Sequence, residues 1–322
     1  MAISTRLTEL LKIQHPILLA PMDLVADGKL AATVSRAGGF GIIGGGYGNE
    51  EWLARELDAA GDARVGVGFI TWSMAKNPRI LDIALERRPA ATMLSFGDVR
   101  PHAPKIKKAG ALMLCQVQTV EQAKDAVANG ADALVAQGAE GGGHGIARGT
   151  FALVPAVVDA ARGVPVAAAG GVADGRGLAA ALMLGADGVM VGTRFYATRE
   201  AVGAKAAKER IVAASGDRTI RSILFDIARG NVWPAPYTGR VLRNEFSEKW
   251  RGREAELMQH QAEEAARYGK ARSAEDFDTA AVIAGECVDM ITDIPPAAEV
   301  VERISKEASA LLAGSNRYRV AE

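Results

Sequence analysis

The sequence has no excess of charge of either sign. Its 322 residues include 38 Lys and Arg against 38 Asp and Glu, and no long run of one sign occurs. Proteins that bind nucleic acid or an anionic membrane usually carry a basic patch or stripe. The balanced composition therefore predicts neither a nucleic-acid partner nor a membrane partner, and it favours a small-molecule ligand.

Long apolar runs are also missing. No stretch approaches the roughly 20 apolar residues that a membrane-spanning helix needs. The N-terminal sequence MAISTRLTELLKIQHP interleaves charged residues with short apolar pairs, and so it does not resemble the apolar centre of a signal peptide. We expect a cytoplasmic protein.

Cysteine is scarce. The chain has two, Cys115 and Cys287, and their spacing gives neither a disulfide framework nor a zinc-ligand pattern. Both are therefore expected to be buried thiols.

The sequence does contain a regular series of short apolar runs. They recur every 20 to 32 residues or so, roughly the length of one strand, one loop and one helix. Near-continuous apolar runs are typical of parallel strands that are covered on both faces. The eight runs are Pro16–Ala20, Phe40–Ile43, Val65–Val67, Thr92–Ser95, Leu112–Gln116, Leu134–Ala136, Val164–Ala168 and Gly188–Val191.

Four of the predicted helices end in a similar way, with SRAGGF, KKAGAL, VANGAD and MLGADG, and the next strand starts at once. A glycine in such a junction can take the left-handed conformation after a helix C-terminus. Eight units joined in this way favour a closed (β/α)₈ TIM barrel in the α/β class, and an open doubly wound sheet is the alternative. We expect residues 1–200 to form the barrel, 201–285 a helical insertion or lid, and 286–322 a C-terminal helix packed on the barrel.

Glycine-rich turns follow the last three predicted strands. Their sequences are QGAEGGGHG, AGGVADGRG and GTRF. Glycine backbone N–H groups can approach an anion closely, and TIM barrels commonly bind phosphate at the loops after strands seven and eight. The second and third turns each lead into a predicted helix, so we expect two helix N-termini to point at the same phosphate. The remaining rim positions lack clustered Asp, Glu and His, which predicts no metal site.

One of the four histidines lies on this rim. His144 stands among Gly141, Gly142, Gly143 and Gly145, with little side-chain bulk around it. A histidine titrates near neutral pH and can act as an acid or base on a bound ligand. Composition and placement leave two interpretations open, a catalytic histidine and one that is merely exposed.

The motifs in their order resemble those of the nitronate monooxygenases, once called 2-nitropropane dioxygenases. The match runs from about residue 5 to residue 200, and DIPPAAEVVERISKEA resembles the C-terminal helix of the family. The motifs are LAPM (Leu19–Met22), SFG (Ser95–Gly97), QV (Gln116 and Val117), AQGAEGGGHG (Ala136–Gly145), PVAAAGGVADGRG (Pro165–Gly177) and GADGVMVGTRF (Gly185–Phe195).

This resemblance implies an FMN-dependent TIM barrel that oxidises alkyl nitronates, or nitroalkanes, with O₂ to a carbonyl compound and nitrite. It implies that His144 is the catalytic base. Backbone groups of Gly170, Gly171, Gly192 and Thr193 would hold the FMN phosphate. The flavin ring would lie over the barrel near Met22, Gln116 and Gln137, and Gly143 is a further implied cofactor-binding residue.

Three other functions share parts of this pattern. One is a related FMN-dependent reductase that uses NAD(P)H on a quinone or an enoyl thioester. A second is a flavin-free barrel enzyme acting on a sugar phosphate, and a third is a non-catalytic flavin-binding module. The oligomeric state is also left open, a homodimer being one option.

Overall fold

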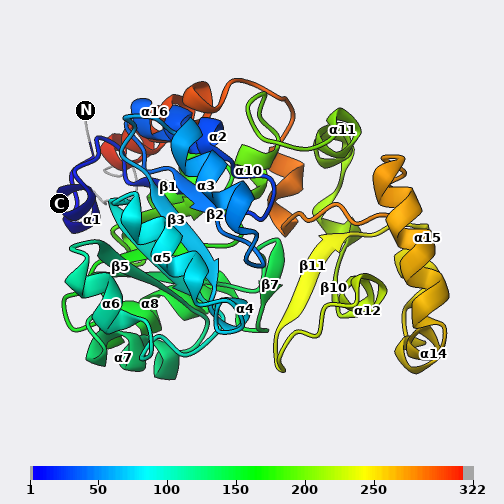
Figure 1. Ribbon diagram of the computed structural model, residues 1–322. Helices are drawn as coiled ribbons and strands as arrows, with labels where there is room; N and C mark the ends of the chain where they lie inside the picture. Colours follow the sequence, from blue (N-terminus) through cyan, green and yellow to red (C-terminus); the bar gives the residue numbers. More distant parts are fainter. Residues whose placement is uncertain (1–2, 315–322) are drawn as a thin grey trace.

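The computed structural model describes residues 3–314 and has a barrel with a smaller cap beside it (Figure 1). Residues 1–2 and 315–322, at the ends of the predicted segments 1–200 and 286–322, lie outside the described residues. No helix within residues 3–314 is long and apolar enough to cross a membrane.

All eight apolar runs form strands of one parallel sheet, in the order β1-β9-β8-β6-β5-β4-β3-β2. A parallel bridge between Leu18 and Phe40 closes the sheet, and the Leu19 N–H donates to the Phe40 carbonyl at 2.9 Å. The predicted (β/α)₈ TIM barrel is therefore confirmed. Its strands are β1 (Ile17–Leu19), β2 (Ile42–Gly44), β3 (Gly66–Ile70), β4 (Ala91–Ser95), β5 (Leu112–Val117), β6 (Ala133–Gln137), β8 (Val166–Ala169) and β9 (Gly188–Val191).

Helices alternate with the strands and cover the outside of the barrel (Figure 1). They are α2 (Gly28–Arg36), α3 (Glu50–Ala59), α4 (Thr71–Met74), α5 (Arg79–Glu86), α6 (Ala103–Lys108), α7 (Val120–Ala128), α8 (Thr150–Ala160), α9 (Gly175–Met183) and α10 (Thr193–Tyr196). The predicted junction glycines Gly38, Gly110, Gly130 and Gly185 all have positive φ, between 75° and 90°. Local sequence therefore specified how these helices end.

Two apolar clusters fill the barrel. The larger lies between the strands and the outer helices, and the smaller fills the interior. Leu7 and Leu11 of α1 (Arg6–Leu11) belong to the interior cluster, so this helix contributes to the core inside the strands. Both cysteines are buried, as expected. Burial raises the pKa of Cys115 to about 12 and that of Cys287 to about 11, which leaves both as neutral thiols.

The cap contains a sheet that we did not predict. Strands β10 (Thr219–Ser222) and β11 (Thr238–Leu242) pair antiparallel, and β11 also pairs with β7 (Gly143–Gly145). The expectation of a helical insertion or lid over 201–285 did not include these strands. The helices of the cap are α11 (Lys205–Ala213), α12 (Leu224–Arg229), α13 (Glu245–Trp250), α14 (Glu254–Gln259) and α15 (Gln261–Ser273).

The C-terminal part returns to the barrel. After the short 3₁₀ helix η2 (Glu286–Met290), helix α16 (Ala297–Ala313) packs against α9 and α2. Its Val301, Ile304 and Ala308 are buried in the larger cluster. Arg194 of α10 donates to the Asp293 carboxylate at 2.9 Å, which joins the segment before α16 to the barrel rim.

The tight contact of α16 with α9 predicts a large cost for one added methyl group. A Cβ at Gly175 would lie 2.5 Å from the Ala308 nitrogen and from Glu307 Cβ. We expect Gly175→Ala to lower the free energy of unfolding by about 1–3 kcal/mol, because the two helices must move apart.

Gly269 of α15 is the matched control, since a Cβ there has no neighbour within 4 Å. Gly269→Ala should leave stability unchanged or raise it by up to about 1 kcal/mol through helix propensity. Chemical unfolding followed by circular dichroism measures both, and equal stability of the two variants would contradict the packing described here.

Candidate active site

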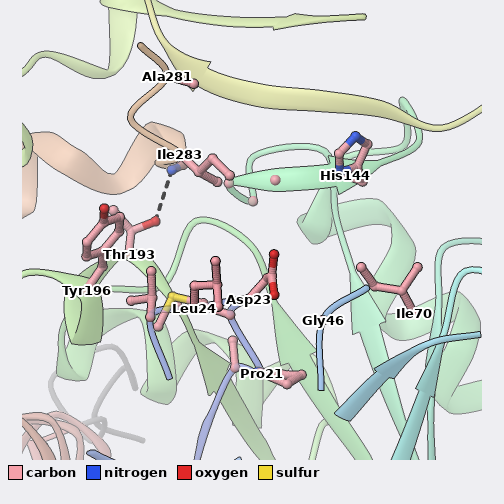
Figure 2. Close-up of a pocket in the computed structure, with 18 of the residues that line it drawn as sticks. Pro21, Asp23, Leu24, Gly46, Ile70, His144, Thr193, Tyr196, Ala281 and Ile283 are labelled. Carbon is pink, nitrogen blue, oxygen red and sulfur yellow. Dashed lines mark hydrogen bonds between the residues drawn. The ribbon is translucent and has the colours of Figure 1, made fainter. Parts of the chain in front are cut away.

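A cavity of about 430 Å³ lies at the carboxyl ends of the barrel strands, between the barrel and the cap. This is the face on which TIM barrels carry their active sites, and the volume suits a cofactor or small substrate. Figure 2 shows His144 on one side of the cavity, with Asp23 and Thr193 across from it. All nine sequence-predicted site residues line it, namely Met22, Gln116, Gln137, Gly143, His144, Gly170, Gly171, Gly192 and Thr193.

A chain of side-chain hydrogen bonds crosses the strand ends. Ser95 Oγ of β4 donates to Gln116 Oε1 of β5 at 3.0 Å, and Gln116 Nε2 donates to Gln137 Oε1 of β6. Gln137 Nε2 then donates to the His144 carbonyl at 3.0 Å. Because each amide is fixed at both ends, the chain sets which atoms donate and which accept on this wall of the cavity.

His144 is not exposed. Its Nε2 lies 3.0 Å from Asp226 Oδ2, and the two side chains are only 10% and 8% exposed. This rules out the interpretation of His144 as a merely exposed residue. A carboxylate bound to one ring nitrogen fixes the tautomer, so that Nε2 carries the proton and Nδ1 has the free lone pair.

An indole ring covers one face of this histidine. The Trp233 ring stacks on the His144 imidazole with centroids 3.4 Å apart and planes 6° from parallel. Trp233 Nε1 donates to Tyr47 Oη at 3.0 Å, and Phe96 and Tyr237 contact the indole edge-on. Trp233 belongs to the loop before β11.

Burial lowers the pKa of the His144 imidazole, although the hydrogen bond to Asp226 acts in the opposite direction. The positive charges of Arg229 and Arg221 add to the lowering. A lowered pKa keeps the imidazole neutral at neutral pH, which is the state that a general base requires.

Arg221 of β10 holds the glycine-rich turn in place. Its guanidinium donates to the carbonyls of Ala139 at 2.8 Å, Gly141 at 3.1 Å and Thr238 at 2.6 Å. Burial lowers its pKa to about 10, and the neighbouring charge of Arg240 contributes. The half-buried Arg221 guanidinium therefore holds the turn before His144 against the cap.

The second glycine-rich turn is open to a ligand. Gly170 and Gly171 have φ of 94° and 79°, and none of the described hydrogen bonds uses the N–H groups of Gly171 and Gly192. Thr193 Oγ1 accepts from the Gly285 N–H at 3.0 Å, the bond drawn in Figure 2. Backbone donors from two neighbouring turns are thus available at one end of the cavity.

The expectation that the helix after the second turn points free N–H groups at this end is wrong. The Asp174 carboxylate accepts from Arg176 N at 3.0 Å, and Glu307 of α16 accepts from Gly175 N at 2.8 Å. These two carboxylates already accept hydrogen bonds from the first backbone N–H groups of α9. Any anion site here must therefore use the turn backbone instead.

Several residues of this site carried no sequence signal that we recognised. Asp226, Arg221 and Arg229 come from the cap, far from the glycine-rich turns in sequence, and no motif surrounds them. Asp23 follows the predicted Met22 directly, and burial raises the pKa of its carboxyl.

Within residues 3–314, no group of three or more His, Cys, Asp or Glu is placed to hold a metal. That the protein uses no metal stays a prediction.

The environment of His144 predicts its titration. In an NMR pH titration, we expect the His144 ring to titrate below an ordinary histidine, with the signal assigned by its loss in His144→Gln. Asp226→Asn should lower the pKa further, because it removes the interaction that favours the protonated ring. A His144 pKa at or above the ordinary value would contradict the buried, neutral base.

The family model described as nitronate monooxygenase matches residues 4–63 and 69–307. The chain is 35% identical to nitronate monooxygenase npaC of Metarhizium robertsii, over 92% of this chain and 91% of the relative. Among solved structures, FabK from Thermotoga maritima superposes with a TM-score of 0.88 at 32% identity, covering 98% of this chain and 100% of the other. Nitroalkane oxidase from Streptomyces ansochromogenes gives 0.82 at 26% identity, covering 96% and 99%.

The family match covers well over half of the chain and includes both the glycine-rich turns and the cap that brings Asp226 to His144. The chain therefore belongs to the nitronate monooxygenase family.

Proposed function

We propose that this protein is an FMN-dependent enzyme that oxidises alkyl nitronates with O₂ to a carbonyl compound and nitrite. One observation carries the proposal beyond the family match. A buried histidine with a lowered pKa lines a cavity that also contains backbone anion donors and an ordered row of amides.

The residues present suit FMN. The N–H groups of Gly171 and Gly192, with Thr193 beside them, would bind the phosphate. Gln116 and Gln137 would offer donors and acceptors to the polar edge of the ring, and Met22 and Gly143 would contact its faces. When bound, FMN would accept electrons from the substrate and pass them to O₂.

The protein side chains would handle the proton. A nitronate is already an anion and needs no base, whereas a neutral nitroalkane must first lose a proton from its α-carbon. His144 Nδ1 has the free lone pair to accept that proton, since Asp226 occupies Nε2. Asp226 would then stabilise the imidazolium that forms.

Relatives named nitronate monooxygenase, at about 35% identity, favour this function over the NAD(P)H reductase and over a flavin-free sugar-phosphate enzyme. The homodimer and the cytoplasmic location stay predictions.

Replacing the base should separate the two substrates. We expect His144→Asn to lower kcat/KM for a neutral nitroalkane by about 10²–10⁴-fold, the usual contribution of a general base. Activity on the preformed nitronate should change far less, because this substrate has no proton for the base to remove. The bound flavin should remain visible in the absorption spectrum.

The control is His102→Asn, because His102 lies at the N-cap position of α6 without a side-chain capping bond and does not line the cavity. It should leave both rates near those of the wild type. An equal loss on both substrates in His144→Asn would contradict the role of His144 as a base.

A further inference from the structure

Arg229, the last residue of α12, lines the cavity without a protein partner for its charge. It is half-buried, and within residues 3–314 it makes no side-chain hydrogen bond and no ion pair. Its one described contact is with the Tyr47 ring, whose centroid lies 5.7 Å from the guanidinium carbon. By contrast, the two terminal nitrogens of Arg221 donate to backbone carbonyls, and Arg240 pairs with Glu286 at 2.8 Å.

The charge of Arg229 acts on groups on both sides of the cavity. It contributes to the lowered pKa of His144. It also opposes the effect of burial on the pKa of Asp23 and of Tyr47. All of these residues line the same cavity, so the charge of Arg229 is close enough to act on each of them.

No carboxylate neutralises Arg229 by contact. Asp226 is bound to His144, and Asp23 makes no hydrogen bond or ion pair within the described structure. Burial outweighs the arginine charges at Asp23 and raises the pKa of its carboxyl. An unpaired, half-buried guanidinium attracts an anionic ligand more strongly than an exposed one does, because water and salt screen its charge less.

We propose that Arg229 binds the two oxygen atoms of the nitro or nitronate group and is a catalytic residue beside His144. The proposal rests on the function proposed above. The planar guanidinium presents two parallel N–H donors, and the nitronate group presents two coplanar oxygens with the spacing of a carboxylate.

The proton transfer explains what this contact contributes. The α-carbon proton moves to His144 Nδ1, and the C–H electron pair forms the C=N bond. One N=O π pair then moves onto oxygen, so the substrate gains one negative charge and the imidazole one positive charge. Arg229 would stabilise the charge that develops on the oxygens, and it would hold the α-carbon beside the base.

Arg272 of α15 provides a matched control. It also lines the cavity and its charge also reaches Asp23, but its side chain is exposed. If long-range attraction to any positive charge lining the cavity accounts for anion binding, the loss of Arg272 should weaken it measurably, though less than the loss of the half-buried Arg229. If Arg229 makes a bidentate contact, its loss should cost far more.

The test uses propionate, a stable carboxylate with the shape of the nitronate of nitroethane. Its Kd is measured on the flavin-loaded protein from the change in flavin absorbance. We expect Arg229→Gln to weaken propionate binding by at least about tenfold and Arg229→Lys by a smaller factor, because lysine keeps the charge and loses the fork. Arg272→Gln should weaken it less than about threefold, as expected for an exposed charge.

Turnover is measured in parallel, and Arg229→Gln should lower kcat/KM for both nitroethane and its nitronate by about 10²-fold or more. Arg229→Lys serves as a second variant in case Arg229→Gln misfolds. The flavin content of each variant shows whether its cofactor site is intact. Unchanged propionate affinity in Arg229→Gln, or an equal loss in Arg272→Gln, would overturn the role of Arg229. If the wild-type protein binds propionate and does not oxidise nitronates, the proposed function fails instead.

Discussion

The pairing of β7 with β11 holds the candidate active site together. β7 is a three-residue strand within the glycine-rich turn of the barrel, and its register places Gly239 opposite His144. A larger residue than glycine at that position would bring a side chain against the imidazole, since a Cβ there lies 3.4 Å from His144 Nε2. Arg221 reinforces the same junction through three carbonyls from both sides. The cap is thus joined to the barrel at His144 itself.

The position of helix α12 depends on this junction between the barrel and the cap. It begins two residues after β10, and so the sheet determines where its side chains lie. Asp226 and Arg229 are both on this helix, and both line or border the cavity beside His144. One short helix therefore supplies the carboxylate that binds the His144 ring and a cation that lines the cavity. The barrel contributes the glycine backbones and the amides.

Most of the barrel could be predicted from the sequence because its signals are local. Each strand is an apolar run, and each junction glycine lies directly after its helix. The cap could not be predicted in the same way. The hydrogen bond between His144 and Asp226 joins residues 82 positions apart, and Glu307 reaches Gly175 across 132 positions. β7 was missed because three residues, two of them glycine, carry no strand preference of their own and pair only when β11 is present.

The visible absorption spectrum of the purified protein, before and after anaerobic addition of propionate 3-nitronate, tests the central claim most directly. The account predicts an oxidised flavin spectrum that loses intensity when the nitronate is added, because electrons pass to the bound cofactor. A flavin that stays oxidised with nitronate and bleaches with NADH would contradict nitronate oxidation. A protein that remains colourless after incubation with FMN would contradict the cofactor assignment itself.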